Sequence, residues 1–179
     1  MLPWKTYDAM HAAVTAEPES FWLDAARRIT WQQAPVQACG RRSDGWYDWF
    51  PTATLNTCYN AVDRHVEGGR GHQAALIWHS CATKERQVVS YRALQRRVAG
   101  FAGGLRALGV QKGDRVLVAM PTMIETAIAM LACARLGAGH GVGTAGYAGP
   151  EFARRGDGVA GSAERPVGKE GRYRWSPDH

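Results

Sequence analysis

The 179-residue sequence lacks several features that would place it in a class at once. It has no run of five or six like charges and no CxxC pair among its four cysteines. The longest apolar-rich stretch, 127–136, is half of the roughly 20 residues that a membrane-spanning helix needs, and Arg135 interrupts it. No basic segment followed by an apolar one opens the chain, so we expect no secretory signal. These absences argue against a membrane protein or a disulfide-bonded one, and predict a cytoplasmic protein with reduced thiols.

Charge is present but scattered. Lys and Arg number 22 against 16 Asp and Glu, which gives a net charge of +6 and a pI near 9.4. That balance would suit an anionic partner such as a nucleotide, CoA or a nucleic acid. However, the basic residues occur mostly as Arg pairs on expected polar surfaces, and no nucleic-acid-binding motif accompanies them. We therefore predict a solvated surface with no nucleic-acid or membrane partner, and rank a nucleic-acid binder third among the alternatives.

The first 66 residues predict a helical arm. Thr6 is a suitable N-cap for a short first helix, and Pro18 suits the first turn of a second one. Residues 30–54 are rich in aromatic side chains and in Pro and Gly, which predicts an irregular segment. The pattern turns helical again over 55–66. The expected buried face of the second helix comprises Phe21, Trp22, Ala25 and Ile29.

The next part of the chain predicts an α/β fold. Residues 73–80 and 86–91 read as two strands of a hairpin. Ser90 then stands where an N-cap belongs, before a helix with a narrow apolar stripe. That stripe consists of Leu94, Val98, Phe101, Leu105 and Leu108.

A strand over 116–120, a helix over 123–136 and a further strand from about Ala138 complete the pattern. Together they predict a βαβ unit with a parallel sheet. The expected buried side of the helix comprises Ile124, Ala127, Ile128, Leu131 and Ala134.

Three stretches carry a resemblance to a known family: "WF…LNTCYNAVDRH", "YRALQRRVAGFAGGLRALGVQKGDRV" and "MPTMIETAIAMLACARLGAGH". They resemble the N-terminal part of short-chain acyl-CoA synthetases, the AMP-forming acetyl- and propionyl-CoA ligases of the adenylate-forming superfamily. The likeness covers about residues 3–137, and the opening "TYDAMHAAVTAEPESFWLDAARRITWQQ" is similar to the propionyl-CoA type. The resemblance implies a truncated N-terminal portion of the large synthetase domain: a helical arm, a β-hairpin and an incomplete βαβ parallel-sheet unit.

The resemblance also implies a division of the chain. Residues 1–66 would form the arm, 67–158 the incomplete start of the AMP-dependent synthetase domain, and 159–179 a disordered or out-of-context tail. By the same resemblance, the aromatic stretch 46–65 would fasten the arm onto the large domain. Its polar residues Asn56, Asn60, Asp63 and His65 would then be caps and satisfied contacts.

The functional rival for that stretch is a metal or acid/base cluster. Cys58, His65, His72 and His79 recur every seven residues. Gly68 and Gly69 interrupt any helix that could align them, and structural zinc favours closely spaced ligand pairs. We therefore predict a structural stretch and no metal site.

The family's chemistry implies Mg-ATP and CoA as cofactors. A carboxylate attacks the α-phosphate of ATP to give an acyl-adenylate, and the CoA thiol then displaces AMP. The family places its phosphate-binding loop, ribose-binding Asp and catalytic Lys beyond the segment that matches here, and nothing in 138–179 resembles that loop. The resemblance therefore implies no catalytic residue in this chain, no tight cofactor binding and no activity by the chain alone, with acetate or propionate left open as the acid. A companion synthetase chain is the expected partner, either completing a split enzyme or binding the chain as a non-catalytic interaction module.

One site residue carries over from the family. Gly146 aligns with the second glycine of a Gly-Gly-Phe turn that lies beside the adenine of CoA, while Ala145 replaces the first. The rival interpretation is a flexible turn without a ligand. Before this turn, Gly139, Gly141 and Gly143 stand where the family carries larger side chains, and they predict a strand that is weak or absent.

Overall fold

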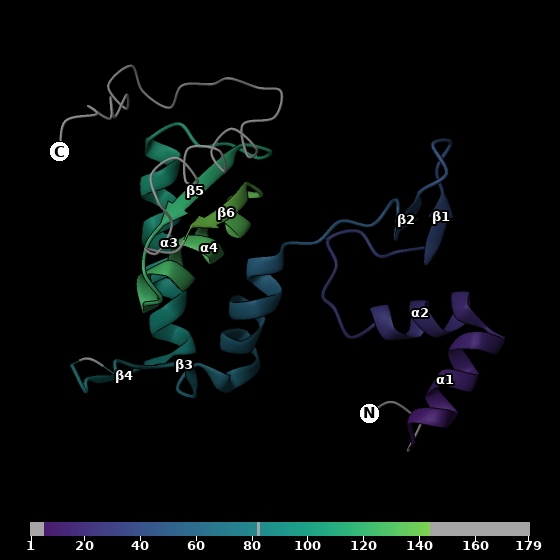
Figure 1. Cartoon of the computed structure of the whole chain (residues 1–179), viewed down its shortest axis with the longest axis horizontal. Helices are drawn as coiled ribbons and strands as arrows, with labels where there is room; N and C mark the ends of the chain where they lie inside the picture. Colours follow the sequence, from purple (N-terminus) through teal and green to yellow (C-terminus); the bar gives the residue numbers. More distant parts are fainter. Residues whose placement is uncertain (1–5, 82, 144–179) are drawn as a thin grey trace. The chain divides into compact units, whose positions relative to one another are not determined.

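The computed structural model describes residues 6–81 and 83–143. They belong to two compact units that divide after Asn56 (Figure 1). The division that we predicted, at 66/67, lies further along the chain, inside a helical segment of the second unit. Gly146 and the predicted tail 159–179 lie outside the described residues.

Helices α1 (Tyr7–Ala16) and α2 (Pro18–Ala26) open the first unit as predicted. Thr6 caps α1, because its hydroxyl oxygen accepts a hydrogen bond of 3.3 Å from the N–H of Ala9. The predicted buried face of α2 is only partly correct. Phe21 is buried, whereas Trp22 is 37% exposed, and Ile29 lies beyond the end of the helix and is 38% exposed.

The segment that we predicted to be irregular contains a small antiparallel hairpin, formed by β1 (Cys39–Arg41) and β2 (Tyr47–Trp49). Gly45 makes its turn possible, because its φ of 87° lies in the left-handed region. Rings from this hairpin and from α2 pack within the unit, with the Trp22 and Trp49 centroids 5.4 Å apart in an edge-on contact. Trp49 of the 46–65 stretch therefore contacts a ring of the arm's own unit, although its side chain stays 54% exposed.

The second unit begins with a helical segment of unusual geometry. It contains two π-helical stretches, η1 (Tyr59–Asp63) and η2 (Val66–Arg70). The predicted helix over 55–66 is thus present in position but differs in type. The φ of 83° at Gly69 breaks the helical path near the predicted end. Next comes the predicted antiparallel hairpin, β3 (Ala74–His79) with β4 (Arg86–Ser90).

Helix α3 (Tyr91–Ala107) starts at the predicted cap, where the Ser90 hydroxyl oxygen accepts a hydrogen bond of 3.3 Å from Ala93 N–H. Its buried stripe follows steps of four residues: Leu94, Val98 and Ala102. The prediction of Phe101 and Leu108 in this stripe was wrong, since they are 42% and 67% exposed. Because the buried residues follow one another in steps of four, the next buried position after Val98 is Ala102, and Phe101 lies at the side of this buried face.

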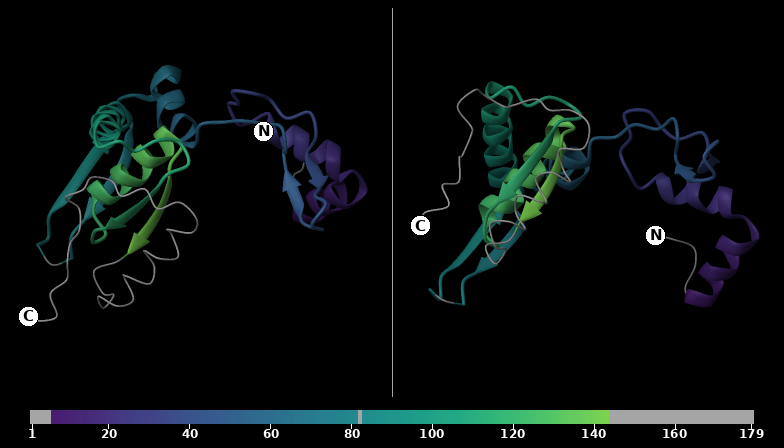
Figure 2. Two further views of the ribbon diagram at one scale, coloured as in Figure 1. Left: turned by 90° about the horizontal axis from the view of Figure 1, so that it is seen from above. Right: turned by 45° about the horizontal axis from the view of Figure 1, so that its top comes forward.

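The predicted βαβ unit is confirmed: β5 (Arg115–Ala119), α4 (Ile124–Leu136) and β6 (Gly139–Gly143) follow one another, and the two strands pair in parallel (Figure 2). Gly137 ends α4 in the left-handed conformation with φ 73°. The predicted buried side of α4 is correct for Ile124 and Ile128. Ala127, Leu131 and Ala134 are only half-buried, and the other buried positions are Ala129, Ala132 and Cys133.

We predicted that this strand would be weak or absent; β6 is formed along five paired residues, so it is not absent. Pairing and packing explain its survival. Val116 packs against the cluster of Val110, Cys133 and Ala138 and pairs with His140, so His140 and Val142 lie on the same side of the strand pair as Val116. Because side chains alternate along a strand, the three glycines occupy the opposite side, so the side of Val116 keeps its side chains. Whether the strand is weak stays a prediction.

The main core of the second unit lies between η1, the β3–β4 hairpin, α3 and α4. Its fully buried members include Cys58, Val98 and Ala132, each 0% exposed. Within residues 6–81 and 83–143, no helix has the length and apolar character needed to cross a membrane.

Candidate functional site

The carboxyl edge of the β5–β6 pair is where an open parallel sheet binds ligands. In the described part of the chain this edge comprises the loop 120–123 after β5, the start of α4 and Gly143 at the end of β6. Gly146, the predicted CoA contact, follows Gly143 in the chain but lies outside the described residues.

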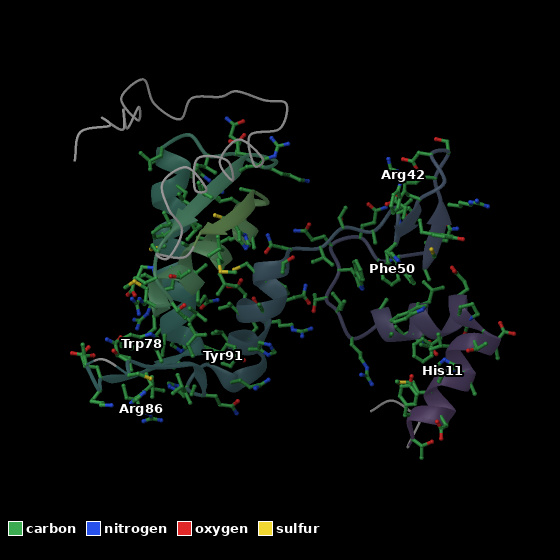
Figure 3. The ribbon with its side chains drawn as sticks, in the orientation of Figure 1. His11, Arg42, Phe50, Trp78, Arg86 and Tyr91 are labelled. Atoms are coloured by element: carbon green, nitrogen blue, oxygen red, sulfur yellow. The ribbon has the colours of Figure 1, made fainter. Side chains whose placement is uncertain are left out.

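Side chains donate hydrogen bonds to two backbone carbonyl groups of this edge. The Trp78 indole N–H donates to the carbonyl oxygen of Thr122 at 3.1 Å, and the Thr126 hydroxyl donates to that of Pro121 at 2.6 Å (Figure 3). Glu125, in the first turn of α4, forms an ion pair of 2.6 Å with Arg97 of α3. These contacts hold the loop 120–123 and the first turn of α4 in place.

The most buried polar cluster of the described residues lies elsewhere, where η1, α3 and α4 meet. Asp63 is 7% exposed. The Arg135 guanidinium donates to both of its carboxylate oxygens, at 2.9 and 2.8 Å. The Gln95 side-chain amide adds a third hydrogen bond of 2.8 Å. One carboxylate thus ties together three helical elements, which is a structural role.

Burial and charge set the protonation of this cluster. Burial raises the pKa of the Cys58 thiol, while the charge of Arg135 opposes that rise. Burial by itself lowers the pKa of Arg135, but its hydrogen bond to Asp63 and the neighbouring charges more than offset this and raise that pKa overall. Cys58 is therefore a protonated, inaccessible thiol and not a nucleophile.

A second polar group joins the end of η2 to the start of α3. The Arg70 guanidinium lies 3.3 Å from His65 Nδ1 and 5.5 Å from the centre of the ring of Tyr91, which is labelled in Figure 3. Since arginine only donates, Nδ1 must accept, and the ring is neutral with its proton on Nε2. Burial, followed by the charges of Arg70 and Arg64, lowers the pKa of His65.

The four residues of the seven-residue repeat do not come together. Cys58 is in the core and His65 lies against Tyr91, while His79 ends β3 opposite Arg86. Among residues 6–81 and 83–143, no three His, Cys, Asp or Glu side chains form a group that could hold a metal ion.

The sequence predicted that the Asp63 carboxylate would have a hydrogen-bond partner, but it did not identify Arg135 as that partner. Arg135 lies 72 positions away and entered the prediction only as a break in an apolar stretch. The available signal was that break itself, because a charged residue inside an otherwise apolar helix needs an ion-pair partner.

Two family models match the chain one after the other. The model described as "Acetyl-coenzyme A synthetase N-terminus" matches residues 7–61, and the model described as "AMP-binding enzyme" matches residues 62–154. The second match covers a little over half of the 179 residues.

Known proteins give the same picture. The chain is 49% identical to an uncharacterized protein of Pseudomonas aeruginosa over 84% of its own length and 24% of that protein. It is 41% identical to the acetyl-coenzyme A synthetase of Streptomyces coelicolor, over 82% of this chain and 24% of that protein. It is 40% identical to the mitochondrial acyl-CoA synthetase short-chain family member 3 of Rattus norvegicus, over 86% of this chain and 22% of that protein. The solved acetoacetyl-CoA synthetase of Streptomyces lividans superposes with a TM-score of 0.77 at 29% identity, over 87% of this chain and 24% of that one. The chain thus spans about a quarter of the length of these relatives.

Proposed function

Since the chain belongs to the AMP-binding enzyme family, we propose that it supplies the N-terminal part of a short-chain acyl-CoA ligase. The reaction of the whole enzyme would join a small carboxylic acid to CoA, with ATP converted to AMP and pyrophosphate. The consecutive match of the synthetase N-terminus model and the AMP-binding model supports this proposal most directly. Their junction at 61/62 lies close to the division of the structure after Asn56.

The proposed acid is acetate or propionate. The chain is about equally similar to a relative named acetyl-coenzyme A synthetase, at 41%, and to one named acyl-CoA synthetase short-chain family member 3, at 40%. Overall identity therefore does not choose between them, although the stretch 6–33 resembles the propionyl type. The proposed cofactors are ATP, Mg²⁺ and CoA, with Gly146 beside CoA, and the proposed location is the cytoplasm.

We further propose that the 179 residues by themselves do not activate an acid. The sequence has no loop of the phosphate-binding type, which supports this proposal. Exchange of labelled pyrophosphate into ATP, with acetate or propionate present, tests this. The purified 179-residue chain should show only background exchange, whereas a polypeptide that includes the remaining part of a synthetase should show exchange. Turnover by the 179 residues alone would contradict the proposal.

The second candidate is a non-catalytic interaction module that docks with a companion synthetase chain. One observation favours it: among the described residues, the parallel sheet of the second unit has only two strands. Sheets of this kind are normally larger and covered on both faces. Purification of the chain together with a separate synthetase polypeptide would favour this candidate, and a stable, well-folded monomer would weigh against it.

A further inference from the structure

Helix α3 has an outward side that points away from the core of the second unit. Leu94, Val98 and Ala102 face the core, so the positions on the opposite side of the helix face outward. These outward positions are all exposed, and we call them the outer face of α3: Arg92, Arg96, Gly100, Gly103 and Ala107. Phe101 and Leu108, which are 42% and 67% exposed, border this face on one side.

The second unit carries an excess of positive charge that its own carboxylates do not balance. Residues 57–143 contain eleven Lys or Arg against five Asp or Glu. Each of the five carboxylates already accepts a hydrogen bond within the unit: Asp63, Glu67, Glu85, Asp114 and Glu125. The unit therefore attracts a negatively charged partner from outside.

Helix α3 holds a large share of this excess. It contains four arginines and no acidic residue. Arg97 pairs with Glu125 of α4, whereas the other three have no ion pair in the described part of the chain: Arg92, Arg96 and Arg106. Arg92 and Arg96 are four residues apart, and like charges at this spacing destabilise a helix. Carboxylates on a partner would offset this repulsion.

Between these arginines the outer face is flat. An added Cβ at Gly100 or at Gly103 would meet nothing within 4 Å, so no described part of the chain needs the space that these glycines leave. Each glycine inside a helix costs about 1 kcal/mol relative to alanine. A second helix can therefore approach α3 closely at this point, with Phe101 and Leu108 offering apolar contacts at its side.

We propose that the outer face of α3 docks a helix of a partner protein that has acidic residues near both ends and small or apolar residues between them. Arg92 and Arg106 are about 21 Å apart along the helix axis, so the acidic residues of the partner would be separated by about four turns. This inference does not depend on the proposed ligase function.

The charge of α3 also disfavours other occupants. A second copy of this chain fits less well, because α3 has no carboxylate and would set arginine against arginine in either direction of packing. A nucleic acid fits less well too, since the uncharged middle of the outer face would leave its phosphates without a cation.

Fluorescence anisotropy with a synthetic peptide tests the surface. The probe is a labelled helical peptide with Glu at the positions that would face Arg92, Arg96 and Arg106, and with Leu and Ala between them. The control peptide has Gln in place of every Glu. The full 179-residue chain should bind the Glu peptide at least roughly fivefold more tightly than the Gln peptide, and rising salt should reduce this difference. Equal binding of the two peptides, or no binding of the Glu peptide, would overturn the proposal.

Paired charge variants show where the peptide binds. Arg92→Gln/Arg96→Gln should weaken binding of the Glu peptide at least roughly fivefold. The matched control, Lys84→Gln/Arg86→Gln, also removes two positive charges but lies on the β3–β4 hairpin, and it should leave the affinity nearly unchanged. Equal weakening by the two pairs would show a general effect of charge and overturn the proposal, as would unchanged binding in the α3 pair.

Gly103→Leu tests the shape of the outer face. The added Cβ has free space and leucine favours a helix, so the variant should fold at least as stably as the unmodified chain. Its side chain would stand in the path of a docked helix and should weaken binding of the Glu peptide at least roughly tenfold. Unchanged binding would overturn the proposal. So would tighter binding of phosphatidylglycerol vesicles or of single-stranded DNA than of the Glu peptide, or a dimer of the chain that Gly103→Leu dissociates.

Discussion

The Asp63–Arg135 pair offers the sharpest test of what holds the second unit together. The Asp63 side chain is 10% exposed and that of Arg135 is 26% exposed, with N–O distances of 2.8 and 2.9 Å. Removing one partner of a buried ion pair costs about 3–5 kcal/mol, since the other charge is left without compensation. Asp63→Asn leaves the guanidinium, which water reaches in part, so we expect a loss near the lower end, about 3 kcal/mol. Arg135→Met leaves the more buried carboxylate, so we expect it to cost more.

Urea unfolding followed by circular dichroism measures both losses, as a fall in the free energy of unfolding at an unchanged denaturant slope. A loss of about 3 kcal/mol is a large part of the roughly 5–15 kcal/mol that stabilises a domain. The matched control is Asp48→Asn on the exposed strand β2, which should change stability by no more than about 0.5 kcal/mol. The double variant Asp63→Asn/Arg135→Met should lose less than the sum of the single losses, because both act on one interaction. Strict additivity, or an Asp63→Asn variant as stable as the control, would refute the reasoning.

Three further predictions concern single positions. The pKa of His65 is lower in the folded chain than in the unfolded chain, so the contribution of this group to stability is present at neutral pH and is lost as the pH falls from the ordinary histidine pKa through the lowered one. An NMR titration should show the lowered pKa, and Arg70→Gln should raise it in part. An unchanged pKa in the variant would exclude Arg70 as a cause. Ser90→Ala should cost about 1 kcal/mol of unfolding free energy through loss of the α3 cap, and Ser90→Thr should restore most of it; equal losses in both would show that the cap does not act. Gly137→Ala should lower the stability of the folded chain, because Gly137 has φ 73° and the added Cβ would lie 3.0 Å from Lys112 Cγ. Gly103→Ala in α3 should raise the stability by about 0.5–1 kcal/mol, because its added Cβ meets nothing within 4 Å. Melting temperatures that shift in the same direction in both variants would contradict this.

Local signals in the sequence predicted the elements with strong caps and clear periodicity. Ser90 and Gly137 mark the start of α3 and the end of α4 because each acts through its own backbone neighbourhood. The hairpin of β1 and β2 escaped prediction because strands of three residues are too short to show alternation. The π-helical geometry of η1 also has no simple periodic signature.

Contacts between distant positions were the part that sequence reasoning could not supply. It identified Asp63 as a polar residue with a satisfied contact, but the partner depends on how α4 packs against η1 and α3, which is a property of the folded unit. The carboxyl edge of the parallel sheet was predictable as a location, because βαβ order fixes where the strands end. The engagement of the Thr122 carbonyl by Trp78 was not, since it joins the hairpin to a loop 44 positions away.

The glycines of β6 show why a count of missing side chains overstated the damage to this strand. A Val or Ile at such a position contributes about 1.5–3 kcal/mol only when its side of the sheet is covered. The glycine side of β6 is the side of Leu117, which is half-buried, whereas the other side keeps Val142 opposite the buried Val118. The contacts that hold β6 to α4 and β5 are thus retained, and the missing side chains cost stability only where another element would pack on the Leu117 side.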